Sequence, residues 1–143
     1  MPTAETAWPG IRLFAGFGCR RGCPADLLID LLRSTLEAHA LPLRALEGLA
    51  SIDLKIGEPG LLMLAARLDI PFECFGSLHL AAFEASLSHR SSAAWRHTGC
   101  WGIAESAALA MATRACGSAQ LLVPRQSAGQ ATLALACSAP FTR

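Results

Sequence analysis

Short apolar runs alternate along this chain with segments of helical periodicity, and this alternation constrains the fold more than any other feature. A helix between two strands requires a crossover connection, which favours parallel pairing of those strands. The sequence therefore predicts a single α/β domain, layered around a mixed, mainly parallel sheet of about five strands with flanking helices and a C-terminal β-hairpin. The expected strands are 11–15, 43–49, 71–75, 121–124 and 131–137, and the expected helices are 24–39, 61–68, 77–87 and 104–116.

The composition is that of one folded domain. The chain has 143 residues, of which 52% are hydrophobic and 16% charged, so it is long and apolar enough to bury a core. Residues 1–10 are expected to form an N-terminal lead-in, and 11–143 the domain. The start of the chain lacks the basic and apolar segments of a signal peptide, and the longest uncharged stretch, 126–142, is broken by Ser, Gly, Thr and Pro. A cytoplasmic location without a membrane partner is expected.

Charge and cysteine content argue against several classes of function. The net charge of +1 does not predict a surface for nucleic acid. The six cysteines include no CxxC pair and no Cys–His cluster with zinc spacing, so we expect free thiols in a reducing compartment and no metal site. The histidines are expected at the surface and the tryptophans in packing; these residues are His39, His79, His89, His97, Trp8, Trp95 and Trp101.

The first expected strand leads into a glycine-rich loop, Gly16–Cys23, which precedes a helix. This loop has one residue too many for the dinucleotide fingerprint, and it lacks the GK(S/T) of a P-loop. Glycines allow a ligand to approach the backbone, and a helix N-terminus offers free N–H groups to an anion. Arg20 and Arg21 add guanidinium groups that match carboxylate or phosphate. Anion binding is one interpretation, and a tight turn with two solvated arginines is the other.

The second expected strand leads into a polar loop, 50–60. Ser51, Asp53 and Lys55 alternate there, so in an extended chain they share one face. Lys55 either pairs with Asp53 or contacts an anionic substrate while Asp53 orients it. Glu58 is placed to stabilise the dipole of the next helix, and the whole segment also fits a simple capping turn. Because ligands of open α/β sheets bind at the carboxyl ends of strands, the two loops are expected to form the site.

Four residues of these segments are candidate catalytic groups. Asp53 and Glu105 are candidates for acid or base, and Cys19 and Ser51 for nucleophile. A helix N-terminus and two arginines are expected to lower the pKa of Cys19. Glu105 also fits the first turn of its helix without any catalytic role. Because no acid–base pair with an orienting partner is recognisable, the sequence leaves open whether the protein is an enzyme.

Several segments in this order resemble a known family. They are GxGCRRG at 16–22, ASIDLKxxEPGL at 50–61, GxAExAAL at 102–109, and LLVP(K/R)Q followed by ATLALA at 121–136. The combination is similar to the CobE and CbiG C-terminal domain family of cobalamin (vitamin B12) biosynthesis, over about residues 11–137, and in particular to its free-standing form. Two positions depart from the pattern: Arg125 stands where Lys is common, and Ser106 where Pro often follows the glutamate.

This resemblance implies a function in corrin-ring assembly. The implied ligand is a ring-contracted precorrin, an apolar macrocycle with acetate and propionate side chains. The protein is expected to bind this intermediate as a carrier or accessory protein. No cofactor is expected. The longer CbiG proteins open a lactone in such an intermediate and release acetaldehyde. The alternative function is therefore that of a related, hydrolase-like enzyme. Other enzymes of the cobalamin pathway are further expected partners. The binding residues carried over are Gly16, Gly18, Cys19, Arg20, Arg21, Gly22, Ser51, Asp53, Lys55 and Glu58.

Overall fold

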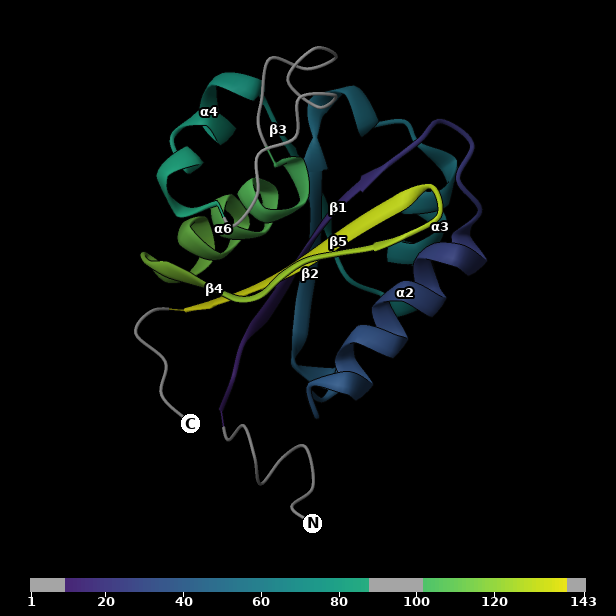
Figure 1. Cartoon of the computed structure of the whole chain (residues 1–143), viewed down its shortest axis with the longest axis horizontal. Coiled ribbons are helices and arrows are strands. Elements are labelled where there is room, and N and C mark those ends of the chain that lie inside the picture. The colour runs from purple at the N-terminus through teal and green to yellow at the C-terminus, as the bar shows by residue number, and fades with distance from the viewer. Residues whose placement is uncertain (1–9, 88–101, 139–143) are drawn as a thin grey trace.

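A mixed sheet of five strands forms the centre of the computed structural model, which describes residues 10–87 and 102–138 (Figure 1). The strand order is β3-β2-β1-β5-β4. The first three strands run parallel, β5 runs antiparallel to β1, and β4 completes a hairpin with β5. This confirms the predicted fold class. The strands are β1 (Leu13–Cys19), β2 (Leu46–Ile52), β3 (Phe72–Phe75), β4 (Ala119–Ala128) and β5 (Ala131–Ser138).

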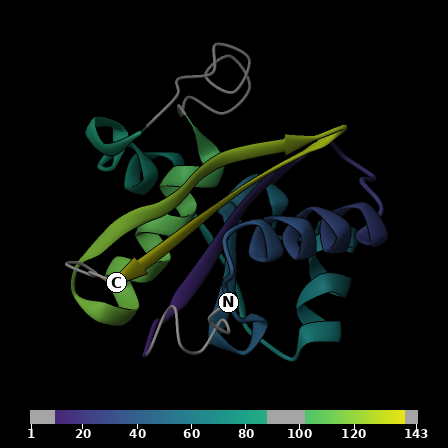
Figure 2. The same cartoon turned by 60° about the horizontal axis from the view of Figure 1, so that its bottom comes forward.

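Helices cover both faces of this sheet (Figures 1 and 2). On one face lie α2 (Ala25–Ala38) and α3 (Pro59–Leu68), and on the other lie α6 (Ile103–Cys116) and the short α4 (Ser77–Ala81). Within the described ranges, no helix has the length and the apolar character needed to cross a membrane. Three 3-10 turns complete the described elements: η1 (Leu43–Ala45), η2 (Asp53–Lys55) and η3 (Glu84–Ser86).

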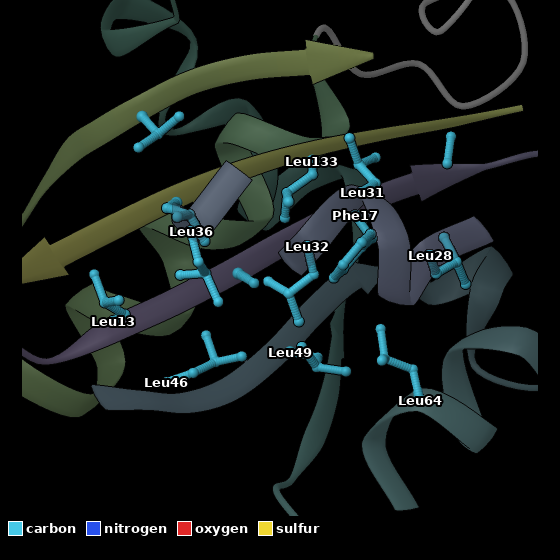
Figure 3. Packing of buried hydrophobic residues seen from close by; sticks show 14 of the residues in the cluster. Leu13, Phe17, Leu28, Leu31, Leu32, Leu36, Leu46, Leu49, Leu64 and Leu133 are labelled. Atoms are coloured by element: carbon cyan, nitrogen blue, oxygen red, sulfur yellow. The ribbon is translucent and has the colours of Figure 1, made fainter. Parts of the chain in front are cut away.

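The larger core lies between α2, α3 and the sheet (Figure 3). Side chains alternate along β1, so that Leu13 and Phe17 enter this core while Phe14 packs on the opposite face, with α6. The apolar spacing that predicts α2 is the spacing of its buried positions, which recur every three or four residues. The cluster in Figure 3 includes Leu28, Leu31, Leu32, Leu36, Leu46, Leu49, Leu64 and Leu133.

Several element boundaries differ from the predictions. β1 does not stop before Gly16 but continues to Cys19, so half of the expected glycine-rich loop is strand. β2 starts three residues late because 43–45 forms a 3-10 turn after Pro42. The expected helix 77–87 is the shorter α4 followed by η3. The predictions for residues 1–9, for the loop 88–101 and for Trp8, Trp95, Trp101, His89 and His97 lie outside the described residues.

Candidate functional site

The carboxyl ends of β1, β2 and β3 lie at one edge of the sheet, which we call the carboxyl edge, because these strands are parallel. β1 leads there into the arginine turn, residues 20–23, and β2 into the lysine loop, residues 53–58. The tip of the β4–β5 hairpin reaches the same edge, where the Arg20 N–H donates to the Gln130 carbonyl at 3.0 Å. The expectation that the two loops are neighbours is therefore met.

The arginine turn is held by its own backbone. The Cys23 N–H donates to the Arg20 carbonyl at 3.1 Å, and Gly22 has a φ of +80°, a conformation that L side chains rarely adopt. Arg20 and Arg21 are both exposed. Among the described residues, neither guanidinium forms an ion pair. Both are therefore placed to meet an anion in solution.

One carboxylate joins the arginine turn to the lysine loop. Glu58 is 6% exposed, and its Oε2 accepts a hydrogen bond of 2.9 Å from the Gly22 N–H. Its Oε1 lies 3.6 Å from Nζ of Lys55, whose side chain is 20% exposed. Glu58 precedes α3 as its N-cap residue but makes no side-chain cap bond there. The ion-pair partner of Lys55 is therefore Glu58 rather than Asp53. The carboxylate of Glu58 links the two loops by contacting Gly22 in one and Lys55 in the other.

Ser51 and Asp53 do not share a face with Lys55. Ser51 is part of β2, and its buried hydroxyl donates to the Phe17 carbonyl at 2.7 Å. Asp53 starts a 3-10 turn, whose three-residue repeat abolishes the alternation expected of an extended chain. Its carboxylate is exposed and faces Gly76, where a Cβ atom would lie 3.6 Å from Oδ2. Ser51 thus braces β1 against β2, while Asp53 reaches the end of β3.

The pKa of Cys19 shifts in the opposite direction from the prediction. Burial raises it to about 11, and the nearby Lys55 only partly counteracts this, while Cys23 and Glu58 raise it further. Loss of solvent around the thiol outweighs the neighbouring cation, so Cys19 is protonated at neutral pH and is a poor nucleophile.

The free thiols in the described ranges are Cys19, Cys23, Cys74, Cys116 and Cys137. Those ranges contain no group of three side chains that could hold a metal ion.

Glu105 lies inside the fold, in the first turn of α6. It is 1% exposed, and its Oε2 accepts a hydrogen bond of 2.7 Å from the Arg125 N–H in β4. β4 changes register with β5 between Val123 and Gln126, so this bond fixes an irregular part of the strand to the helix. This contact gives Glu105 a structural role.

Two glycines expected in the ligand loop are instead packing positions in β1. A Cβ atom at Gly16 would overlap the carbonyl of Ala104 in α6, and one at Gly18 would lie 2.8 Å from Oγ1 of Thr132. A missing side chain therefore permits close packing of the helix and of β5 against β1. The space beside both glycines is occupied by protein, which leaves no room for a ligand on that side.

The carboxyl edge also has an apolar component, which the sequence predictions did not include. Leu54 and Ile56 in the lysine loop are 67% and 69% exposed, and Leu78, two residues beyond Gly76, is 89% exposed. Large aliphatic side chains within a polar loop are the pattern that indicates such a surface. Together with the three cations, these side chains make the edge amphipathic.

Two apolar grooves lie at the opposite edge of the sheet, which we call the amino edge. One, of about 490 Å³, is lined by Leu43, Leu46, Leu68 and Ile70 with Arg44. The other, of about 210 Å³, lies between α2 and α3. Their linings are dominated by aliphatic side chains, so they do not offer the convergent cations that a ligand with several carboxylates requires. We therefore place the candidate site at the carboxyl edge rather than in these grooves.

Comparison with known families places this architecture in cobalamin biosynthesis. The family described as "Cobalamin synthesis G C-terminus" matches residues 13–136. Protein CobE of Sinorhizobium sp is 34% identical over 134 residues, which cover 94% of this chain and 85% of the relative. The crystal structure of CobE, a protein from the cobalamin (vitamin B12) biosynthetic pathway, superposes with a TM-score of 0.85 at 45% identity, covering 90% of this chain and 91% of that one.

A second kind of relative is a longer protein. A cobalt-precorrin-5A hydrolase of Salmonella typhimurium is 47% identical over 73 residues, which are 51% of this chain. The match spans only 21% of the length of that hydrolase. A cobalt-precorrin-5A hydrolase of Priestia megaterium is 27% identical over 124 residues, which span 32% of its length.

Proposed function

This chain belongs to the cobalamin synthesis G C-terminus family, and we propose that it binds a ring-contracted precorrin or related corrinoid as a carrier or accessory protein. Participation in cobalamin biosynthesis follows from the family and from the CobE relatives. The finer proposal concerns the ligand and its fate. The carrier would hold the intermediate and present it unchanged to the next enzyme.

One observation carries this proposal: the carboxyl edge combines three cations with exposed aliphatic side chains. Arg20, Arg21 and Lys55 come from two loops that Glu58 holds together. Leu54 and Ile56 lie exposed in the lysine loop itself. A corrinoid has the complementary chemistry, because carboxylates surround an apolar ring. Guanidinium groups form paired hydrogen bonds with carboxylates, and the aliphatic side chains would cover part of the ring.

A hydrolase-like enzyme acting on the same intermediate is the second candidate. The hydrolase relatives favour it, since one of them is 47% identical over half of this chain. Within the described residues, however, three of the four groups proposed for catalysis are poorly arranged. Cys19 is held protonated, the Ser51 hydroxyl bonds to Phe17, and Glu105 bonds to the backbone of β4. This arrangement supports binding more than covalent or acid–base chemistry.

A visible-absorbance titration separates the two candidates. Purified protein is titrated with ring-contracted precorrins and with hydrogenobyrinic acid, a metal-free corrin polycarboxylate. A carrier gives a spectral change that saturates at one ligand per chain, with the ligand recovered unchanged. An enzyme gives a change that continues beyond one equivalent and yields a new product. No change with any of these ligands would contradict both candidates and favour a domain that docks onto another enzyme of the pathway.

A further inference from the structure

We propose that Glu58 is a positioning residue, which sets the arginine turn and Lys55 in the geometry that receives ligand carboxylates. This inference rests on the proposed function. It assigns Glu58 a role that differs from direct contact with the ligand, because its oxygens are directed at the protein. Gly22 and Lys55 are the two groups through which it acts.

The carboxylate of Glu58 divides its two oxygens between the two loops. Oε2 takes the Gly22 N–H at 2.9 Å, and Oε1 lies 3.6 Å from the Lys55 ammonium. Because the carboxylate is 6% exposed, solvent competes little for these contacts. A ligand arriving from solution therefore meets the arginine and lysine side chains before it meets Glu58.

The arginine turn also packs closely against the start of α3. A Cβ atom at Gly60, in the first turn of α3, would overlap the Cys23 carbonyl at the end of the arginine turn. The two backbones therefore touch where the turn leads into α2 and the lysine loop leads into α3. The Gly60 contact and the Glu58 hydrogen bond therefore hold the arginine turn against residues 58–60 at two points.

The negative charge of Glu58 acts on an anionic ligand in the direction opposite to its positioning role. A carboxylate next to a site for a polyanion repels the ligand, so removing Glu58 would strengthen binding if charge alone mattered. If Glu58 positions the cations, removing it has the opposite effect, because Gly22 and Lys55 lose the group that orients them. The sign of the change in affinity therefore distinguishes positioning from simple repulsion.

The test compares Glu58→Ala, Glu58→Gln, Lys55→Met and the Glu58→Ala/Lys55→Met double variant, with hydrogenobyrinic acid as the probe. We expect Glu58→Ala to bind about tenfold more weakly than the unaltered protein, as loss of a hydrogen bond to a charged group implies. Glu58→Gln keeps an acceptor for Gly22 and should lose less. Lys55→Met should cost less affinity in the Glu58→Ala background than in the unaltered protein, because the Lys55 side chain has already lost its orientation there. Glu37→Ala, an exposed position at the far end of α2, is the matched control.

Folded protein is confirmed for every variant by circular dichroism before affinity is measured. Equal or tighter binding by Glu58→Ala overturns the positioning role while leaving the proposed function intact. Strict additivity of the two single changes also overturns it, because residues that act through one another do not add. Failure of the unaltered protein to bind the probe and the ring-contracted precorrins would instead defeat the proposed function.

Discussion

The Cα atom of Gly16 in β1 lies against the backbone carbonyl of Ala104 in the first turn of α6. A Cβ atom at Gly16 would overlap that oxygen and would lie 2.6 Å from the backbone nitrogen of Ala108. The neighbouring face of α6 consists largely of alanine, which permits this approach between the helix and the sheet. The contact fixes how α6 sits on the sheet.

Gly16→Ala should therefore destabilise the fold by about 3 kcal/mol or more, because backbone atoms on both sides cannot yield as a flexible side chain does. Urea denaturation measures this change. Gly57→Ala is the matched control, since no heavy atom lies within 4 Å of a Cβ atom there and φ is not in the left-handed region. We expect the control to alter stability by no more than about 0.5 kcal/mol. Equal denaturation midpoints for both variants would refute the packing role of Gly16.

Arg20→Gln/Arg21→Gln should weaken binding of hydrogenobyrinic acid. Each charged hydrogen bond that is lost should cost about 1–3 kcal/mol. Stability should change little, because both arginines are exposed. Arg33→Gln, on an exposed position of α2 away from the carboxyl edge, removes the same kind of charge and should leave affinity unchanged. Isothermal titration calorimetry checks both; if the double variant keeps full affinity, the arginine turn does not bind the ligand.

The alkylation rate of Cys19 should rise with pH well beyond neutrality. Burial raises the pKa of this thiol to about 11, so the reactive thiolate is scarce at pH 7 and increases roughly tenfold per pH unit up to that pKa. Since an unfolded cysteine ionises at lower pH, the same shift predicts that folding stability falls as pH rises from about 9 through 11. Iodoacetamide labelling mapped by peptide mass spectrometry measures the profile. A rate that is already constant above pH 7 would show a thiolate and contradict the structure.

Glu105→Ala should destabilise the protein, because it leaves the Arg125 N–H without this partner inside the fold. The expected loss is about 1–3 kcal/mol for the unsatisfied group. Thermal denaturation followed by circular dichroism measures the loss, with exposed Glu37→Ala as control. A fully stable Glu105→Ala protein that loses only a ligand-dependent activity would favour the catalytic role considered from the sequence.

Periodicity predicts the elements of this fold well because burial repeats locally along the chain. The spacing of Leu28, Leu31, Leu32 and Leu36 predicts a helix over 24–39, and α2 occupies Ala25–Ala38. Gly16 misleads, because a glycine that admits a neighbouring helix has the same appearance in sequence as a glycine in a loop. Only the packed structure distinguishes the two.

The candidate site was predictable in position but not in its contacts. Arg20, Arg21 and Lys55 follow strands, which is enough to place them at the carboxyl edge. Glu58 accepts a hydrogen bond from Gly22, 36 positions away in the sequence, and such a contact depends on how the two loops pack. The prediction of a low pKa for Cys19 was wrong because burial, which the sequence does not specify at a strand end, outweighs the neighbouring charges.

The location of the ligand is tested most directly by mapping its contacts on the chain. Backbone amide signals of ¹⁵N-labelled protein are followed by nuclear magnetic resonance while hydrogenobyrinic acid is added. Binding at the carboxyl edge predicts that the largest shifts fall in the arginine turn, 20–23, and the lysine loop, 53–58. Shifts confined to the amino-edge grooves, around Leu43 and Leu68, would show that the apolar hollows hold the ligand and would contradict the site described here.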